Sequence, residues 1–288
     1  FLFYNFANTQ EIIIISKVND EIITNIDIEN EKKYLLLLNN NLNKLKKKEF
    51  FELAKNSLIR EKIKKREIDR LYNKQNDKVE NKIIKNFYNK LGFKEEKNFI
   101  DFLNKKKINF NNLKEKLLVE MLWNELIYRS FNKRIRIDES SIKKKIIRYY
   151  NSKDKKYEYQ LSEIVISNEK DIESKKKEIL KFINDFGFKV AANKYSKSDT
   201  SKYGGDIGWI KGTRLSSNVK NIISNINIGK VSKPIQVSNG YIILKINNKR
   251  EIIEKFDLDK ELKQQINFEK NRQLNQFSLN YYKKLKKN

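Results

Sequence analysis

The spacing of apolar residues changes once along the chain, and this change limits the possible folds. Up to about residue 150, apolar side chains recur every three or four positions, as in Phe51, Ala54 and Leu58. That period is typical of amphipathic helices. From residue 157 the segment YEYQLSEIVIS alternates as a strand does. We therefore expect an α+β protein whose helical part precedes an antiparallel sheet.

The helical part begins with a predicted hairpin. Two β-branched runs, 12–18 and 21–24, flank the turn-favouring pair Asn19-Asp20. Asp27 is then expected to cap the first helix. The apolar period predicts helices over 28–41, 48–72, 77–91, 95–106, 111–132 and 141–150. The polar segment NSKDKK that follows indicates a domain boundary near residue 151.

The second part predicts a β-α-α-β-α-β-β unit over residues 157–249, with one antiparallel sheet covered by helices. Its strands are expected at 157–167, after the glycines near 205, at 229–237 and from Gly240 onward. A long basic helix is expected from 256 to 287. Its apolar stripe is too long for a lone surface helix. The stripe consists of Phe256, Leu262, Ile266, Leu274, Phe277 and Tyr281.

Glycine is concentrated in one short stretch. The chain has eight glycines, and four of them lie in SKSDTSKYGGDIGWIKG, residues 196–212. Glycine permits positive φ and close backbone approach, so this stretch predicts a tight turn that leads into a short strand. No Gly-Lys-Ser/Thr follows, and the glycines are too sparse for a dinucleotide fingerprint. We therefore expect no nucleotide site here.

The absence of cysteine and histidine excludes several kinds of chemistry. There is no disulfide, no Cys or His zinc site and no Ser-His or Cys-His nucleophile. We expect no cofactor and no metal, and any reaction must use carboxylates, hydroxyls or lysine. No stretch reaches the roughly 18 apolar residues of a membrane-spanning helix, so we expect no transmembrane segment. The opening FLFYNFAN fits the end of a cleaved signal segment or an ordinary buried strand, and both interpretations stay open.

The net charge of +26 raises the question of an anionic partner. The segments FNKRIRID and YYKKLKK interleave basic and aromatic residues, as nucleic-acid-binding surfaces do. However, the aromatics lie at helical spacing, and lysine-rich composition is common among interchangeable surface residues. We interpret most lysines as solvated surface and expect no specific nucleic-acid partner, while attraction to anionic lipid or acidic polypeptides stays open.

Two runs of the second part resemble the parvulin-type peptidyl-prolyl isomerases. The runs are YSKSDTSKYGGDIGWI and NVKNIISNINIGKVSKPIQVSNGYIILKI, which carry Gly-Gly-Asp-x-Gly-Trp, Gly-x-Val-Ser-x-Pro and Gly-Tyr-x-Ile in the family's order. With the hairpin and helices ahead of it, the chain resembles SurA-like periplasmic chaperones with a single isomerase module. The resemblance implies domains at 1–150, 151–250 and 251–288, with the last helix packing on the N-terminal domain.

The resemblance also implies a proline-binding pocket. By position its apolar floor corresponds to Ile207, Leu215 and Val219, with Trp209 beside it. These four residues are our substrate-binding candidates, although apolar residues on strands and helices are equally expected in a core.

The catalytic positions depart from the family's pattern. Active members carry two histidines, a Cys or Asp, and a Ser or Thr around the prolyl bond. The matching positions here are Glu163 and Ile242 for the histidines, Ser198 for the Cys or Asp, and Asn239 for the hydroxyl. Isoleucine has neither donor nor acceptor, so the family's network cannot form. Asp199 is either a supplementary carboxylate or a turn residue.

Three functions follow as alternatives. The first is a periplasmic holdase that binds unfolded polypeptides, with outer-membrane proteins as clients and a weakly active or inactive isomerase module. The second is an active peptidyl-prolyl cis-trans isomerase that assists the folding of exported proteins. The third, nucleic-acid binding, rests on the net charge of +26 and on the interleaved basic and aromatic residues. The oligomeric state is not determined by the sequence.

Overall fold

A computed structural model describes residues 11–71, 77–152, 155–168, 171–237, 240–252 and 256–286. The chain divides into two compact units, which we describe separately. The first, the helical unit, comprises Phe1–Leu37 and Lys46–Trp123. The second, the sheet unit, comprises Leu38–Leu45 and Asn124–Asn288. The predicted domain boundaries at residues 150 and 250 stay a prediction.

The helical unit contains the predicted hairpin and helices. Strands β1 (Ile14–Val18) and β2 (Glu21–Thr24) pair antiparallel, with Asn19 at positive φ in the turn, as its sequence predicts. The helices are α1 (Asn25–Leu38), α2 (Lys47–Leu71), α3 (Asp77–Lys90), α4 (Glu96–Lys105) and the first part of α5 (Phe110–Phe131). Each agrees with its predicted range to within about three residues, since the apolar period defines it.

The start of α1 differs from the prediction. The Thr24 hydroxyl accepts a hydrogen bond from the Asp27 amide at 3.2 Å, and the Asp27 carboxylate accepts one from the Thr24 amide at 2.8 Å. This reciprocal pattern is a capping box with threonine as the cap and an acidic residue three positions on. The prediction that Asp27 caps the helix was wrong by three residues, because the helix begins directly at the end of β2.

The core of the helical unit is aromatic and includes a buried lysine. Trp123 and Phe99 are fully buried, and the Phe99 ring packs edge-on against Phe87 at 6.0 Å between centroids. Lys64 is only 2% exposed, and its ammonium lies 3.1 Å from the Glu120 carboxylate and 5.4 Å from the Trp123 ring centroid. A buried ammonium needs such partners because its desolvation is costly.

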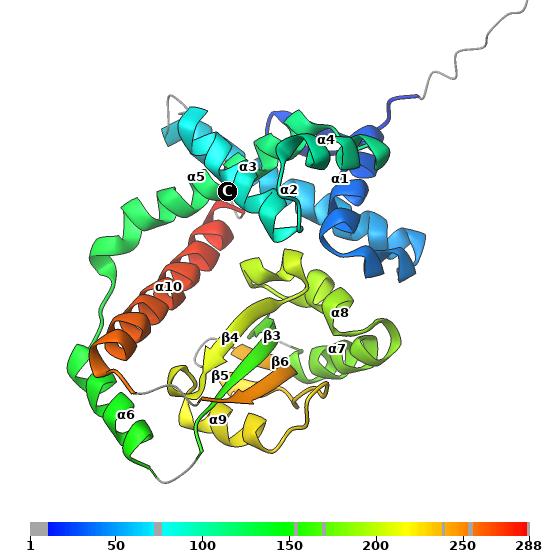
Figure 1. Cartoon of the computed structure of the whole chain (residues 1–288). Helices are drawn as coiled ribbons and strands as arrows, with labels where there is room; N and C mark the ends of the chain where they lie inside the picture. Colours follow the sequence, from blue (N-terminus) through cyan, green and yellow to red (C-terminus); the bar gives the residue numbers. More distant parts are fainter. Residues whose placement is uncertain are drawn as a thin grey trace, which may run out of the picture. The chain divides into compact units, whose positions relative to one another are not determined.

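The sheet unit is built on four antiparallel strands in the order β4-β3-β6-β5. They are β3 (Tyr157–Ser167), β4 (Asp206–Lys211), β5 (Ile235–Val237) and β6 (Gly240–Glu251). Helices α7 (Ile172–Phe186) and α8 (Phe188–Tyr195) lie to one side of the sheet and α9 (Ser217–Ser224) to the other (Figure 1). This arrangement confirms the predicted β-α-α-β-α-β-β order and the α+β class.

One predicted strand is shorter than expected. The segment 229–237 forms regular strand only at β5, and its earlier part meets β6 through an isolated bridge from Val231 to Lys245. Pro234 precedes β5, and proline cannot donate a ladder hydrogen bond. Ser232 keeps the segment on β6, because its hydroxyl accepts a hydrogen bond from the Leu244 amide at 2.9 Å.

The remaining helices of the sheet unit pack beside each other. Helix α10 (Leu258–Leu285) runs along α6 (Glu139–Asn151), as Figure 1 shows. Its Phe277 stacks on Phe131 at the end of α5, with 4.9 Å between ring centroids. Short 3-10 helices at Asn40–Lys44, Asn132–Arg134, Asp199–Tyr203 and Gly212–Arg214 complete this unit.

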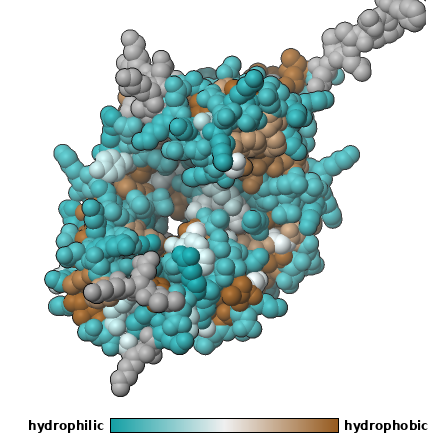
Figure 2. Space-filling view, in the orientation of Figure 1, coloured by the Kyte–Doolittle hydropathy of each residue, from teal (hydrophilic) through white to brown (hydrophobic). Residues whose placement is uncertain are grey.

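The face of the molecule seen in Figure 2 is predominantly hydrophilic. Figure 2 shows apolar side chains on the visible face only in limited patches among hydrophilic ones. Within the described ranges, no helix combines the length and the apolarity that a membrane span requires.

Candidate functional site

The glycine cluster shapes the edge of the sheet next to Glu163. Gly205 has φ +80°, and a Cβ there would collide with the Glu163 carbonyl oxygen. The Glu163 amide in turn donates to the Gly205 carbonyl at 2.7 Å. Only glycine combines a positive φ with this close approach of two backbones. The glycines concentrated in this stretch of sequence therefore allow the Gly205 backbone to approach Glu163 closely, and we call this place the glycine corner.

A bulge at the start of β4 brings an extra residue toward the apolar side of the sheet. Leu161 pairs with Gly208, whereas the next residue, Ser162, pairs with Asp206, so Ile207 has no partner on β3. A bulge reorients the side chain of the extra residue. Ile207 accordingly packs against the same apolar cluster as Leu161.

Three of the four substrate-binding candidates meet in this cluster. Val219 is a buried member of the cluster. Ile207 and Leu215 pack against the cluster and keep part of their surface exposed. Trp209 is not among the members of this cluster in the part of the chain that the structure describes. It pairs with Gln160 on the opposite face of the sheet, where its ring lies 4.2 Å from the Arg250 guanidinium.

The catalytic-position candidates Glu163 and Ser198 also lie together. The Ser198 hydroxyl donates to Glu163 Oε1 at 2.8 Å, and the Thr200 hydroxyl donates to the same oxygen at 3.1 Å. The two hydroxyls are themselves 3.0 Å apart. A partly buried carboxylate is thus held by two neutral donors from the loop that precedes the glycines.

We call Glu163, Ser198, Thr200 and Ile242 together the Glu163 site. The two catalytic-position candidates that remain to be placed are Ile242 and Asn239. Ile242 pairs with Val165 on β3, two residues along the strand from Glu163, and so lies on the same face of the sheet as Glu163. Its side chain is aliphatic and packs against the apolar cluster. Asn239 lies outside the described residues.

Burial determines the protonation behaviour of Glu163. Burial raises the pKa of this carboxyl, while the hydrogen bonds from Ser198 and Thr200 act in the opposite direction. The net rise means that desolvation outweighs the two hydroxyls. The Glu163 site can therefore accept or donate hydrogen bonds, but it has no group that titrates as an imidazole does.

Sequence reasoning missed Thr200. The signal was present, because Ser198 and Thr200 are two residues apart in a polar loop. Asp199 lies between them and accepts a hydrogen bond from the Ser278 hydroxyl of α10 at 3.4 Å.

Among the described residues, no three Cys, Asp or Glu side chains are grouped so that they could hold a metal ion.

Part of the sheet unit matches a known protein family in sequence. Residues 160–248 match the family described as "Rotamase: PPIC-type PPIASE domain". The Chaperone SurA of Pseudomonas putida is 28% identical over 154 residues, which cover 50% of this chain and 36% of that protein. The match thus spans about a third of the curated relative.

Two solved structures align with most of the chain, each at a TM-score below 0.5. PrsA from Bacillus anthracis is 19% identical, covers 80% of this chain and 94% of its own, and has a TM-score of 0.32. A SurA-like chaperone of Campylobacter jejuni is 15% identical, covers 95% of this chain and 96% of its own, and has a TM-score of 0.29. The sequence matches show that the chain is SurA-like and carries a parvulin-type rotamase domain.

Proposed function

We propose that this protein is a holdase: it binds unfolded polypeptides in the periplasm and keeps them from aggregating, with outer-membrane proteins as its clients. The similarity to SurA chaperones supports this assignment. Its rotamase domain is weakly active or inactive in our proposal. What supports this part is that, by the resemblance to active parvulins, Glu163 and Ile242 stand where those proteins carry histidines, so a carboxylate and an aliphatic side chain would replace both imidazoles.

The chemistry of prolyl isomerisation explains why some activity can survive. Rotation about a peptide bond has a barrier of roughly 18–20 kcal/mol, and no proton transfer is required to cross it. An apolar surface that holds the bond twisted and desolvated lowers this barrier. Ile207 and Leu215 retain exposed apolar surface beside the Glu163 site, so they can contact a prolyl ring.

Holding an unfolded chain requires accessible apolar area instead of a catalyst. The hairpin of the helical unit supplies such area. Ile12 is 67% exposed, Ile14 is 62% exposed and Ile22 is 47% exposed. Their side chains can contact apolar segments of a client without any contribution from the rotamase domain.

The alternative is an active peptidyl-prolyl isomerase. The match of residues 160–248 to the rotamase family favours it, because the scaffold and the apolar floor positions are present. The missing imidazoles oppose it.

Two assays on the full chain separate these functions. We expect suppression of aggregation of a denatured outer-membrane protein at near-stoichiometric ratio, and no saturable acceleration of cis-trans exchange in a short X-Pro peptide measured by NMR. Saturable acceleration without suppression would establish the alternative instead.

Paired variants assign the holding activity to one unit. Ile14→Ser with Ile22→Ser removes exposed apolar area from the hairpin, and we expect weaker suppression of aggregation. Ile207→Ser with Leu215→Ser removes it from the rotamase domain, and we expect little change. Ile228→Ser, at a residue 54% exposed, serves as the control. If only the rotamase variant loses suppression, clients are held by that domain.

A further inference from the structure

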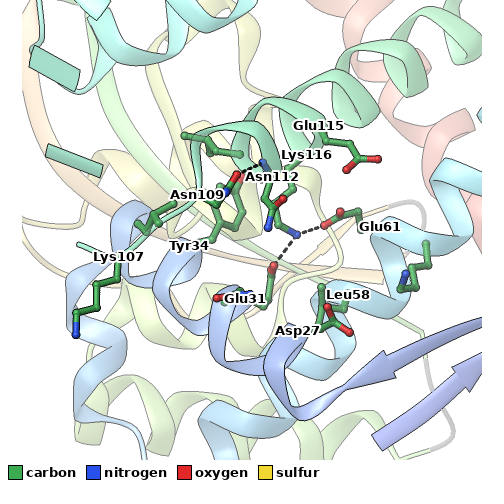
Figure 3. Close-up of a pocket in the computed structure, with 14 residues that line it drawn as sticks. Asp27, Glu31, Tyr34, Leu58, Glu61, Lys107, Asn109, Asn112, Glu115 and Lys116 are labelled. Atoms are coloured by element: carbon green, nitrogen blue, oxygen red, sulfur yellow. Dashed lines mark hydrogen bonds and ion pairs between the residues drawn. The ribbon is translucent and has the colours of Figure 1, made fainter. Parts of the chain in front are cut away.

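The helical unit contains a cavity that the proposed function does not use. Its volume is about 220 Å³, and its walls come from α1, α2, the segment 107–109 and α5. Figure 3 shows Glu31 from α1, Glu61 from α2 and Lys116 from α5 directed toward one another at this cavity. All of the lining residues belong to the helical unit.

Charge distinguishes the cavity from the rest of the chain. Its lining includes four carboxylates, Asp27, Glu31, Glu61 and Glu115, and three ammonium groups, Lys62, Lys107 and Lys116. The cavity is therefore formally negative in a chain with a net charge of +26. The Lys62 ammonium is engaged 2.5 Å from Glu21, which is not a lining residue.

The buried ion cluster at the cavity has an excess of negative charge. The Lys116 ammonium donates a hydrogen bond to Glu61 and lies 2.7 Å from Glu31 Oε2. One positive charge is thus shared between two carboxylates. Burial lowers the pKa of Lys116, but the two carboxylates outweigh it and leave this pKa above its usual value. Burial raises the pKa of Glu61, because Lys116 compensates it only in part.

Glu31 supplies an independent indication of a ligand. Its side chain is 1% exposed, and neither carboxylate oxygen has a hydrogen-bond partner within the described part of the chain. The Lys116 ammonium lies 2.7 Å from Oε2 as an ion pair, and Oε1 has no hydrogen-bond donor among the described residues. A buried acceptor without a donor loses the hydrogen bonds that water gave it in the unfolded chain, so a donor that enters the cavity would be bound favourably.

The size and lining of the cavity define the ligand. A volume of 220 Å³ is below the roughly 300 Å³ of pockets for drug-sized molecules and far above the roughly 30 Å³ of one water. Tyr34, Leu58 and Leu113 give the wall apolar surface, which suits a hydrocarbon stem. The described carboxylates are not grouped to hold a metal ion.

We propose that this cavity binds one alkylammonium or guanidinium group on an aliphatic stem, with Glu31 as the main acceptor. Such a group completes the charge balance of the Glu31–Lys116–Glu61 cluster and donates to the unpaired Glu31 oxygen. A lysine or arginine side chain of a polypeptide has this chemistry, and so does a free aliphatic diamine. The site stands independently of the proposed holdase function.

Calorimetric titration of the full chain tests the site. The probes are Nα-acetyl-lysine methylamide, Nα-acetyl-arginine methylamide and 1,5-diaminopentane, with Nα-acetyl-norleucine methylamide as the uncharged analogue. We expect saturable binding of the cations and at least tenfold weaker binding of the norleucine compound. Tighter binding of the capped amino acids identifies a polypeptide side chain as the ligand, and tighter binding of the diamine identifies a small amine.

Three variants connect binding to the cavity. Glu31→Gln keeps the shape of the side chain and should weaken binding at least tenfold. Glu29→Gln, at an exposed residue of the same helix, should leave it unchanged. Lys107→Gln removes an exposed cation from the lining and should tighten binding two- to fivefold.

The proposal is overturned if no cation binds, if the norleucine compound binds as well as the lysine compound, or if folded Glu31→Gln binds as wild type does. If Glu31→Gln does not fold, the Lys107→Gln variant becomes the test of the proposal. Unchanged or weaker binding of the cations by this variant overturns the proposal. Failure here leaves the holdase proposal intact, because suppression of aggregation is measured separately.

Discussion

The two units bury carboxylates in different ways. In the sheet unit, Glu163 is held by the neutral hydroxyls of Ser198 and Thr200. In the helical unit, Glu31 and Glu61 share the ammonium of Lys116. Neutral donors satisfy hydrogen-bonding capacity without cancelling charge, whereas an ammonium cancels charge but here cannot satisfy both carboxylates.

This difference indicates what each site can do. Burial keeps the Glu163 pKa raised, so the Glu163 site responds to pH through a single carboxyl. The cluster in the helical unit depends on its one cation, and it retains an unpaired oxygen that can accept a ligand. Three predictions test the contrast.

The largest effect is expected from removing the cation. Lys116→Met leaves Glu31 and Glu61 buried without a counter-charge, and breaking a buried pair in this way costs about 3–5 kcal/mol. Urea unfolding followed by tryptophan fluorescence in a Trp209→Phe background reports on the helical unit, because Trp123 is fully buried there. Lys65→Met, which breaks an exposed pair with Asp69, should cost less than about 1 kcal/mol. Equal losses in both variants would show that the cluster is not stabilised by Lys116.

The next effect concerns the backbone that positions Glu163. Gly205→Ala places a Cβ against the Glu163 carbonyl at φ +80°, and we expect a loss of about 1–3 kcal/mol in the stability of the sheet unit. Hydrogen exchange of β3 measures this loss. The matched change is Gly92→Ala, at φ +90° with no heavy atom within 4 Å of the added Cβ. It should cost only the conformational strain of roughly 1 kcal/mol, so a smaller loss for Gly205→Ala would contradict the close approach.

The smallest effect is a dependence on pH. The folded-state pKa of Glu163 is raised above its unfolded value near 4.5, so its stabilising contribution is present below that pH and is lost as pH rises through the folded pKa. The stability of wild type relative to Glu163→Gln should therefore fall as pH rises from about 4.5, by about 1.4 kcal/mol for each unit of pKa difference.

Glu178 is the control of opposite sign for this measurement. The hydrogen bond from Lys175 lowers its pKa, so its contribution is present above the unfolded pKa and is lost as pH falls. The stability of wild type relative to Glu178→Gln should thus rise with pH, although solvent screening makes the change small. A pH-independent difference for Glu163→Gln would show that the carboxyl is not desolvated.

Much of the fold could be predicted because apolar periodicity is a local property. The helices, the hairpin and the strands β3 and β6 lie within a few residues of their predicted bounds. The errors have local causes too: the capping box at Thr24 lies at a direct strand-to-helix junction, and Pro234 shortens β5. The faces of neighbouring strands were harder to predict, since the unpaired Ile207 shifts the register that places Trp209.

Some functional residues could be predicted from the sequence, and others could be found only in the structure. The positions of Glu163, Ser198 and Ile242 followed from a motif, but the contribution of Thr200 required coordinates. The cluster at Lys116 was not predicted, although Glu31 lies within the buried stripe of α1, three residues after Ile28 and four before Leu35. A charged residue on an apolar stripe is a signal for a buried partner, but it does not identify that partner.

The sequence by itself determined the order and type of the elements, the glycine corner and the absence of any imidazole. These depend on residue type and on spacing along one segment. Only the tertiary structure decided which charges meet, since Glu31, Glu61 and Lys116 come from three helices. It also decided that the buried carboxylate oxygens of Glu31 would be left without a hydrogen-bond donor among the described residues, because hydrogen bonding between distant segments depends on how those segments pack.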